Sequence, residues 1–318
     1  MTTLELRSID MRRDDLLMTH ELLAAGYDDL AITRLVRRGD LHRVRHGAYT
    51  YGDLWRDLGA VERRMLRAHA TLRCARSPAV LAGPSAADAF GVPVWDMGDE
   101  THLARLDRKA NRRKTRKVQH RGVLLAEDVT VRDGVPLTSG TRTALDMIAL
   151  ADIPRALVTI NGLLHAGETT SPLLAHRAQG MRHDPFTADS SIVLALADER
   201  CESAGESLFV HVCWAQALPM PVPQFEVRDG RGHLVGRVDF AWPDLGIYLE
   251  FDGRVKYNGL LRPGESAADA VMREKQREQL ISGITGWRCI RIIWADLFHP
   301  ERLAERIRAT VAGRPWAA

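Results

Sequence analysis

The spacing of apolar residues near the N-terminus predicts two helices. Residues 14–25 have helical spacing, and Gly26 is expected to end that helix. Its apolar positions are Leu16, Leu17, Leu22 and Leu23. A second helix, 30–38, follows Asp28 or Asp29 as its cap. It has Leu30, Ile32, Leu35 and Val36 on one face and Arg34, Arg37 and Arg38 on the other.

Residues 41–49 alternate between apolar and polar types and predict two short strands that carry Arg43 and Arg45. Helix, turn, basic helix and basic hairpin is the order of a winged helix-turn-helix. In that fold a basic helix suits the major groove of DNA, and arginines on the wing suit phosphates. The alternative is a small helical domain with exposed arginines.

The stretch 105–121 is a second basic segment, with nine Lys or Arg against one acid, Asp107. Residues 108–117 are almost free of apolar types and predict a loop between strands near 101–106 and 118–121. Such a loop could bind phosphates or RNA, and a solvated hairpin tip is the alternative. The residues expected to contact nucleic acid are Arg112, Arg113, Lys114, Arg116 and Lys117.

A helix is predicted to begin at Thr141 or Thr143, with Ala144, Leu145, Ile148 and Ala149 as its buried face. Arg142 and Asp146 are four residues apart, which favours a structural ion pair. The polar stretch 180–190 then predicts a domain boundary.

The C-terminal pattern predicts the order α-βββ-α-β-α. The expected elements are a helix at 203–217, strands at 224–228, 233–242 and 247–251, a helix at 267–282, a strand at 287–294 and a helix from Pro300. Turns are expected at Asp229-Gly230 and at 243–246.

Carboxylates on these strands are the main candidate for chemistry. If residues 243–246 form a four-residue turn, opposite positions sum to 489, so Asp239 faces Glu250. Asp252 is two residues further and shares that face. Val238, Phe240, Leu249 and Phe251 are then expected on the other face, in the core.

Three like charges on one face repel one another, and Mg²⁺ or Mn²⁺ would relieve that repulsion. A metal-bound water could attack a phosphodiester. The alternative is that Arg237 or Lys256 neutralises the acids without metal. Glu206 has two interpretations: it forms a capping box with Ser203, or it lies near the metal ion.

The charge distribution adds a reason to expect nucleic acid as a partner. The net charge is only +3, but the first 121 residues hold 23 Lys or Arg against 16 acids. This asymmetry favours a polyanion as partner of the N-terminal part, although a solvated Arg-rich surface is the alternative. The four cysteines form no CxxC motif, and no apolar run or signal core suggests a membrane. We therefore expect a cytoplasmic protein.

Three stretches, 35–49, Gly83-Pro-Ser-Ala-Ala87 and 135–146, resemble the AbiEi-type antitoxins of actinobacteria in their order and spacing. The resemblance covers about residues 10–180. It implies a winged helix followed by an α/β domain, with autoregulation of a toxin–antitoxin operon and a cognate toxin as partner.

Residues 200–312 resemble the PD-(D/E)XK nuclease superfamily, near the very-short-patch-repair endonucleases. The residues that carry this are Glu206, Val238-Asp239-Phe240, Leu249-Glu-Phe-Asp-Gly253 and the helix containing Glu274 to Glu278. The resemblance implies Asp239 and Glu250 as metal ligands. Val238 replaces the motif's proline and Asp252 its lysine, so Lys256 or Lys275 would supply the positive charge.

These observations predict an α/β (α+β) protein with three domains. They are a winged helix-turn-helix at 1–52, an AbiEi-like α/β domain at 53–185 and a nuclease-like αβββαβ domain at 190–318. The first functional hypothesis is a DNA-binding, Mg²⁺-dependent endonuclease, with Glu206, Asp239, Glu250, Asp252 and Lys256 as its catalytic residues. The alternative is an AbiEi-like antitoxin and transcriptional regulator with an inactive nuclease-like domain. A weaker third possibility is an RNA-directed nuclease.

Overall fold

The structure, a computed structural model, describes residues 15–75, 77–106, 112–114, 117–120, 124–180, 190–252 and 266–313. Contacts divide the chain into an N-terminal unit, residues 1–151 and 168–185, and a C-terminal unit, residues 152–167 and 186–318. Both units combine helices with β-sheet, which confirms the predicted mixed α/β class.

The described part begins with elements in the order of a winged helix. They are β1 (Leu17–Met18), α2 (Thr19–Ala24), α3 (Asp29–Arg38), β2 (Leu41–Arg45) and β3 (Ala48–Tyr51), and the strands lie in the order β1-β3-β2. The helix predicted from residue 14 is wrong in its first part, because Leu17 and Met18 pair with β3 as a strand. Leu16 and Leu17 enter two different core clusters, which neighbouring residues of an extended chain can do.

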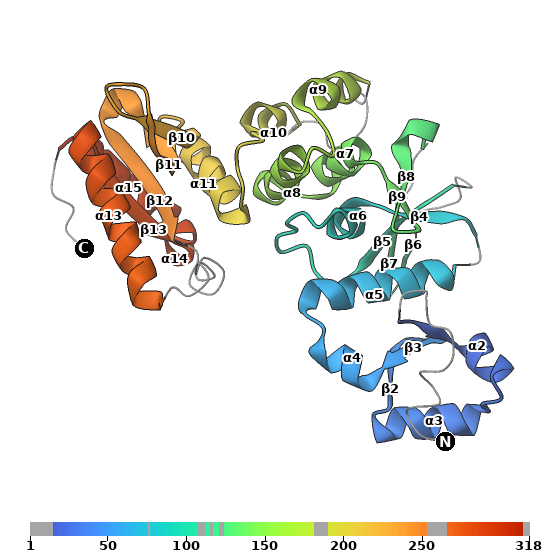
Figure 1. Ribbon diagram of the computed structural model, residues 1–318. Helices are drawn as coiled ribbons and strands as arrows, with labels where there is room; N and C mark the ends of the chain where they lie inside the picture. Colours follow the sequence, from blue (N-terminus) through green and yellow to red (C-terminus); the bar gives the residue numbers. More distant parts are fainter. Residues whose placement is uncertain are drawn as a thin grey trace. The chain divides into compact units, whose positions relative to one another are not determined.

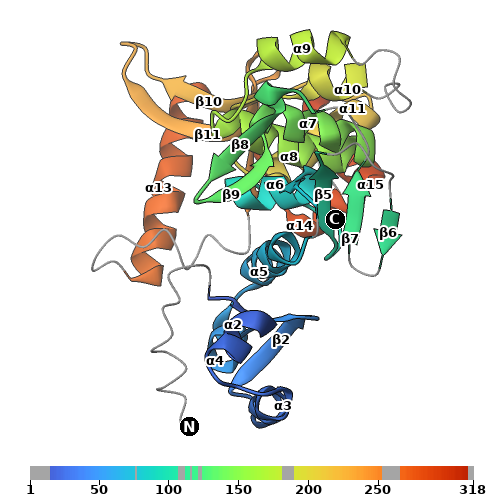
Figure 2. The same ribbon diagram turned by 90° about the vertical axis from the view of Figure 1, so that its right-hand side faces the viewer.

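Two helices, α4 (Gly52–Asp57) and α5 (Ala60–Arg73), lead into a six-stranded sheet. Its strands are β4 (Ala79–Leu81), β5 (Thr101–Arg105), β6 (Arg112–Lys114), β7 (Lys117–His120), β8 (Val129–Arg132) and β9 (Val135–Thr138). Their order is β6-β7-β5-β4-β9-β8, so the β6–β7 and β8–β9 pairs form opposite edges (Figure 2). The strands predicted near 101–106 and 118–121 are confirmed as β5 and β7.

The loop predicted over 108–117 is wrong in part, because residues 112–114 pair with β7 in an antiparallel arrangement. An edge strand tolerates consecutive charged residues, so β6 has no apolar pattern that could reveal it.

The helices of this unit that follow α5 are α6 (Gly83–Phe90), the 3-10 helix η1 (Ala126–Asp128), α7 (Gly140–Leu150) and α9 (Ser171–Gln179). Helix α7 begins earlier than the predicted Thr141 or Thr143, because the Ser139 side chain accepts a hydrogen bond from the Arg142 amide and caps the helix. Its buried face is confirmed at Ala144, Leu145 and Ile148, whereas Ala149 is half-buried.

The C-terminal unit starts with α8 (Ile153–His165), α10 (Ser190–Leu196) and α11 (Ala204–Ala215). Helix α8 lies in sequence within the stretch assigned to the middle domain, yet its contacts place it in this unit. The buried Asn161 of α8 donates a hydrogen bond of 3.1 Å to Ser207 of α11 and accepts one from the Asp198 amide. Two buried groups thus satisfy each other across the helix pair.

A four-stranded sheet follows, in the order β10-β11-β12-β13. Its elements are β10 (Val222–Arg228), β11 (Leu234–Trp242), the 3-10 helix η2 (Pro243–Leu245), β12 (Ile247–Asp252), α13 (Ala267–Thr285) and β13 (Arg288–Ile293), followed by α14 (Trp294–Leu297) and α15 (Pro300–Val311). The predicted order α-βββ-α-β-α is confirmed from α11 onward, with the short α14 in addition. Helices α11 and α13 lie on opposite faces of the sheet (Figure 1).

The register of the β11–β12 hairpin is the predicted one over Phe240–Trp242, and the predicted Asp239–Glu250 position is not among the paired ones. Phe240 pairs with Leu249 and Trp242 with Ile247, and each pair of numbers sums to 489. Next to this ladder the strands become irregular, since Gln224 of β10 has a positive φ of 50° and no paired position is recorded between it and Asp239. Val238 packs with Ile281 of α13, whereas Phe240 contacts Phe209 of α11. The alternation of β11 is therefore interrupted at Asp239, and the prediction that Val238 shares a face with Phe240 is wrong.

Candidate functional site

Helix α3 presents the predicted basic face to solvent. The Asp28 carboxylate accepts a hydrogen bond of 2.6 Å from the Ala31 amide and caps the helix. Gly39 ends the helix with a φ of 80°, a left-handed conformation that glycine adopts without strain. Between these caps Arg34, Arg37 and Arg38 are all exposed. The local sequence therefore fixes both the length of the helix and its exposed charges.

The opposite side of α3 packs into a small core. Ile32 and Leu35 are 3% and 7% exposed and belong to one cluster with residues of α2, β2 and β3. Leu30, predicted to share this apolar face, is instead 73% exposed. The cause is its angular position, because Leu30 lies on the turn that precedes Thr33 and Arg34 and thus on their side of the helix.

The β2–β3 hairpin forms the predicted wing. Arg43 is exposed and Arg45 is half-buried, and the pairing with β3 shifts between them. Arg38 is paired with Asp40 at 2.9 Å while its side chain stays 62% exposed. Of the five N-terminal arginines predicted to bind nucleic acid, Arg34, Arg37 and Arg43 therefore combine exposure with no ion pair among the contacts described.

The structure describes the second basic segment only in part. Arg112, Arg113 and Lys114 form the edge strand β6, and Lys117 begins β7. Arg116 lies outside the described residues. Nucleic-acid contact by this segment stays a prediction.

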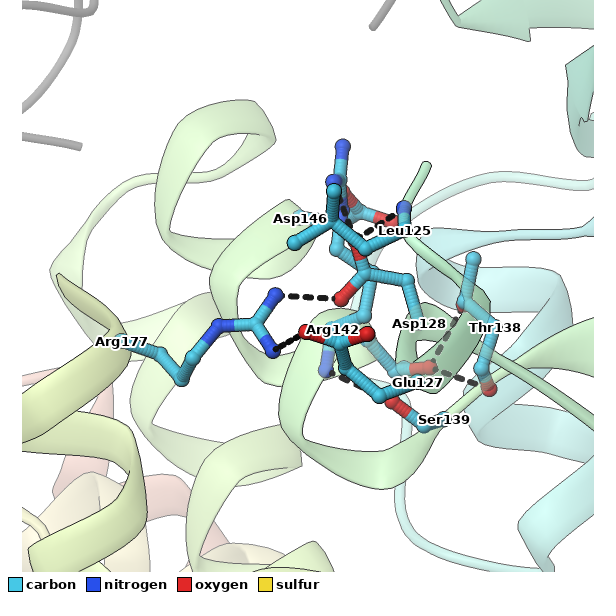
Figure 3. A network of polar contacts seen from close by, with 9 residues as sticks. Leu125, Glu127, Asp128, Thr138, Ser139, Arg142, Asp146 and Arg177 are labelled. Atoms are coloured by element: carbon cyan, nitrogen blue, oxygen red, sulfur yellow. Dashed lines mark hydrogen bonds and ion pairs between the residues drawn. The ribbon is translucent and has the colours of Figure 1, made fainter. Parts of the chain in front are cut away.

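A polar network of which the sequence predicted only one ion pair joins the 3-10 helix η1 to α7 and α9 through Asp128 (Figure 3). Asp128 is 1% exposed and accepts hydrogen bonds from Arg177 at 2.5 Å and Arg142 at 3.3 Å. The predicted Arg142–Asp146 pair is confirmed, with a distance of 2.8 Å. Burial raises the pKa of Asp146, and Arg142 opposes that effect. The contact between Arg177 and Asp128 could not be predicted from a local sequence pattern, because the two residues are far apart in the chain.

Two histidines of the same sheet form a further contact that sequence reasoning missed. Nδ1 of His102 lies 2.9 Å from Nε2 of His120, and the two rings are stacked. Burial and the nearby charge of Arg142 lower the pKa of His120 to about 4. The pair therefore favours an uncharged His120 at neutral pH. Neither histidine belongs to a spacing pattern from which their contact could have been predicted.

In the C-terminal unit, Glu206 acts as the predicted helix cap with one difference. Its carboxylate accepts hydrogen bonds from the Ser203 hydroxyl and from the amide of Glu202, one residue before the expected Ser203 amide. Gln224 also donates to it at 2.8 Å. Burial, and more weakly the charge of Asp239, raise the pKa of Glu206. Glu206 therefore caps the helix and also lies near Asp239, another predicted site residue.

The three strand carboxylates have partners within the fold. The Asp239 carboxylate accepts a hydrogen bond of 2.7 Å from the Phe251 amide. Glu250 is 5% exposed and accepts one of 2.7 Å from Arg277 of α13. Asp252 is paired with Arg291 of β13 at 3.3 Å. The structure thus brings Asp239 toward Glu206 and brings Glu250 and Asp252 to arginines.

Among the residues that the structure describes, the cations paired with Glu250 and Asp252 are Arg277 and Arg291. Arg237, proposed as an alternative partner, is paired with Glu202 at 2.8 Å. Lys256 lies outside the described residues, and Lys275 is exposed on α13. Within the described ranges, no three or more His, Cys, Asp or Glu form a group that could hold a metal ion. The Mg²⁺ or Mn²⁺ site stays a prediction.

Comparison with known proteins supports the N-terminal part of these expectations. Residues 5–52 match the model of a family described as "Transcriptional regulator, AbiEi antitoxin". This stretch contains all five winged-helix elements. The resemblance predicted for residues 53–180 and the one to PD-(D/E)XK nucleases stay predictions.

The chain is also similar to two mycobacterial proteins. These are "Uncharacterized protein Rv2248" of Mycobacterium tuberculosis strain H37Rv and "Uncharacterized protein MT2308" of strain CDC 1551, each 30% identical over 182 residues. The aligned stretch is 55% of this chain and 64% of each relative, which is less than two thirds of their length. None of the helices in the described ranges is long and apolar enough to cross a bilayer.

Proposed function

We propose that this protein is a DNA-binding transcriptional regulator of the AbiEi antitoxin type that represses its own operon. The observation that carries the proposal is the capped basic helix α3, whose Arg34 and Arg37 are exposed. This helix lies within the stretch that matches the antitoxin family. Exposed arginines on one helix of a winged-helix fold suit the phosphates that flank the major groove.

In this proposal the partners are duplex DNA and a cognate toxin, and the protein works in the cytoplasm, where its DNA is. The C-terminal unit then acts as a scaffold with a nuclease-like order of elements. The ion pairs of Glu250 with Arg277 and of Asp252 with Arg291 are compatible with such a structural role.

The test is binding of a labelled duplex that covers the DNA upstream of the protein's own gene. Replacing Arg34, Arg37 and Arg38 together with Ala is expected to weaken binding by at least ~10-fold at low salt, because phosphate contacts are lost. The matched control removes the same charge from exposed arginines of the C-terminal unit, Arg231, Arg288 and Arg302. An equal loss in both triple variants, or no binding by the wild-type protein, contradicts the proposal.

A metal-dependent nuclease is the second candidate function, and the topology of the C-terminal unit favours it. The order of its elements, with β12 parallel to β13, is the one that the nuclease resemblance implies. Asp239 is close enough to Glu206 for its charge to raise the pKa of that carboxyl group. The arginine partners of Glu250 and Asp252 weigh against this function, because they already compensate two of the three acids.

This candidate is tested by incubating plasmid and linear DNA with the full chain and Mg²⁺ or Mn²⁺. The nuclease hypothesis expects cleavage and a metal-dependent rise in melting temperature in the wild-type protein, and the loss of both in Asp239→Asn. Asp244→Asn, at an exposed turn position, is the matched control. If the wild-type protein shows no cleavage and no thermal shift, the regulator is the only proposal that remains.

A further inference from the structure

One exposed stripe of α3 contains an apolar residue among polar ones. Leu30, Thr33, Arg34 and Arg37 have the spacing i, i+3, i+4 and i+7, which places them on one side of a helix. All four are exposed, and Leu30 is the most exposed of the large hydrophobic residues in the described ranges, at 73%.

The fold does not account for this leucine. The core cluster under α3 takes Ile32 and Leu35 from the helix, with Ala31 and Val36 packed at its margin, and Leu30 is not among its members. A single exposed leucine needs no explanation on an arbitrary surface. Here it lies on the same face as the arginines that we propose to approach DNA.

The charges of α3 are divided along its length. Asp28 and Asp29 are at the N-terminal end, and the basic residues Arg34, Arg37 and Arg38 follow in the second half. Phosphates are repelled by the acidic end and attracted by the basic one. The charge pattern therefore directs the C-terminal half to the backbone and leaves the N-terminal half, with Leu30, to the bases.

Base edges are the surface that the N-terminal residues of a recognition helix contact in helix-turn-helix complexes. In the major groove the C5 methyl group of thymine is the apolar group that a side chain can contact. We infer that Leu30 contacts the C5 methyl group of a thymine and so helps to determine the DNA sequence that is bound. This inference rests on the proposed DNA-binding function and adds the chemistry of one contacted base.

The test removes the methyl group from the DNA and the leucine from the protein. The probe is a duplex selected from a randomised library on the wild-type full-length protein, prepared once with thymine and once with deoxyuridine at each thymine position in turn. Because deoxyuridine keeps the hydrogen-bonding groups of thymine, only the methyl contact changes. The proteins are wild type, Leu30→Ala, Leu30→Met and, as a matched control, Val131→Ala at a position 65% exposed on β8.

We expect deoxyuridine at one position to weaken wild-type binding about fourfold, the effect of one buried methyl group. Leu30→Ala should bind the thymine duplex more weakly and lose the preference for thymine at that position. Leu30→Met, which keeps an apolar side chain, and Val131→Ala should retain it. Circular dichroism should show that all variants are folded, since both positions are exposed.

Two results overturn the inference and leave DNA binding intact. One is wild-type binding that is insensitive to deoxyuridine at every position. The other is a thymine preference that persists unchanged in Leu30→Ala, since another side chain would then read the methyl group. Failure of the wild-type protein to select any duplex overturns the proposed function itself.

Discussion

Arg277 of α13 donates a hydrogen bond of 2.7 Å to Oε1 of Glu250 on β12, and this joins the helix to the sheet at a buried carboxylate. The same guanidinium donates to the backbone carbonyl of Arg237 on β11 at 2.8 Å. A residue expected to bind a metal thus has a cationic partner in the fold. The ion pair stabilises the unit only as long as both partners are present, because an isolated buried charge is costly.

The first prediction removes the cation and keeps most of the side-chain volume. Arg277→Met is expected to lower the free energy of unfolding by about 3–5 kcal/mol, because it removes the guanidinium that pairs with the buried Glu250 carboxylate. Adding Glu250→Gln should recover at least about 1 kcal/mol, since the amide carries no charge. Urea unfolding followed by tryptophan fluorescence measures both effects.

Arg288→Met is the control for this pair, at an exposed position on β13, and should change stability by less than about 0.5 kcal/mol. A loss below about 1 kcal/mol in Arg277→Met would show that Glu250 does not depend on this arginine. A Mg²⁺-dependent rise in wild-type melting temperature would in that case favour the metal hypothesis.

The second prediction separates two neighbouring arginines of α3. Arg34 has no described ion pair, whereas Arg38 is paired with Asp40 at 2.9 Å. Arg34→Ala should therefore reduce the salt slope of duplex binding by about one, the amount expected for one lost phosphate contact. Arg38→Ala should reduce it less, because Arg38 must give up Asp40 to reach a phosphate.

Binding measured over a series of salt concentrations gives both slopes. Equal slopes for Arg34→Ala and the wild-type protein would show that Arg34 does not contact phosphate. A larger change in Arg38→Ala than in Arg34→Ala would show that the Asp40 pair opens without cost when DNA binds.

The part of the fold that could be predicted from sequence is the part with local signals. Asp28 and Gly39 mark the ends of α3, and the four-residue turn after Trp242 fixes the register of the β11–β12 hairpin. Strand β1 was missed because the adjacent Leu16 and Leu17 are compatible with two structures. One is an amphipathic helix, and the other is an extended chain that is buried on both sides. Strand β6 was missed because an edge strand needs no apolar residues.

The candidate site could be predicted less well, because its contacts come from distant parts of the chain. The pairing of Glu250 with Arg277 depends on where α13 packs, and the hairpin register carries no information about that. The interruption at Asp239 lies beside Gln224 of the neighbouring strand, which has a positive φ. Strict alternation assigns Asp239 to a face of the sheet from its sequence position alone and takes no account of this neighbouring strand.

The third prediction concerns the network around Asp128. Asp128→Asn keeps the shape of the side chain but removes the charge that Arg142 and Arg177 share. We expect a loss of about 3 kcal/mol in the free energy of unfolding, since two partly buried guanidinium groups each lose the buried carboxylate that they share. Glu127→Gln is the adjacent control, because the Glu127 side chain is 62% exposed and its contact with Arg177 is 3.5 Å long. Equal stability of the two variants would contradict a structural role for the network.

The fourth prediction is a pH dependence that arises from His120. Its pKa of about 4 in the folded protein lies below the ordinary value of 6.5, because burial and Arg142 disfavour the charged ring. Between these two values the unfolded chain binds a proton that the folded chain does not. This contribution to stability is therefore complete above pH ~6.5 and is lost as the pH falls toward ~4. The loss is on the order of 3 kcal/mol.

The matched variant is His120→Gln, which does not titrate and keeps an amide that can hydrogen-bond to Nδ1 of His102. The difference in unfolding free energy between wild type and this variant should shift in favour of the variant as the pH is lowered from 7 toward 4.5. An NMR titration of the His120 ring gives an independent measurement of the same quantity. A midpoint near 6.5 would show that the ring is solvated and that the contact with His102 opens in solution. A midpoint near 4 would show that the sheet keeps His120 uncharged, as its burial beside Arg142 requires.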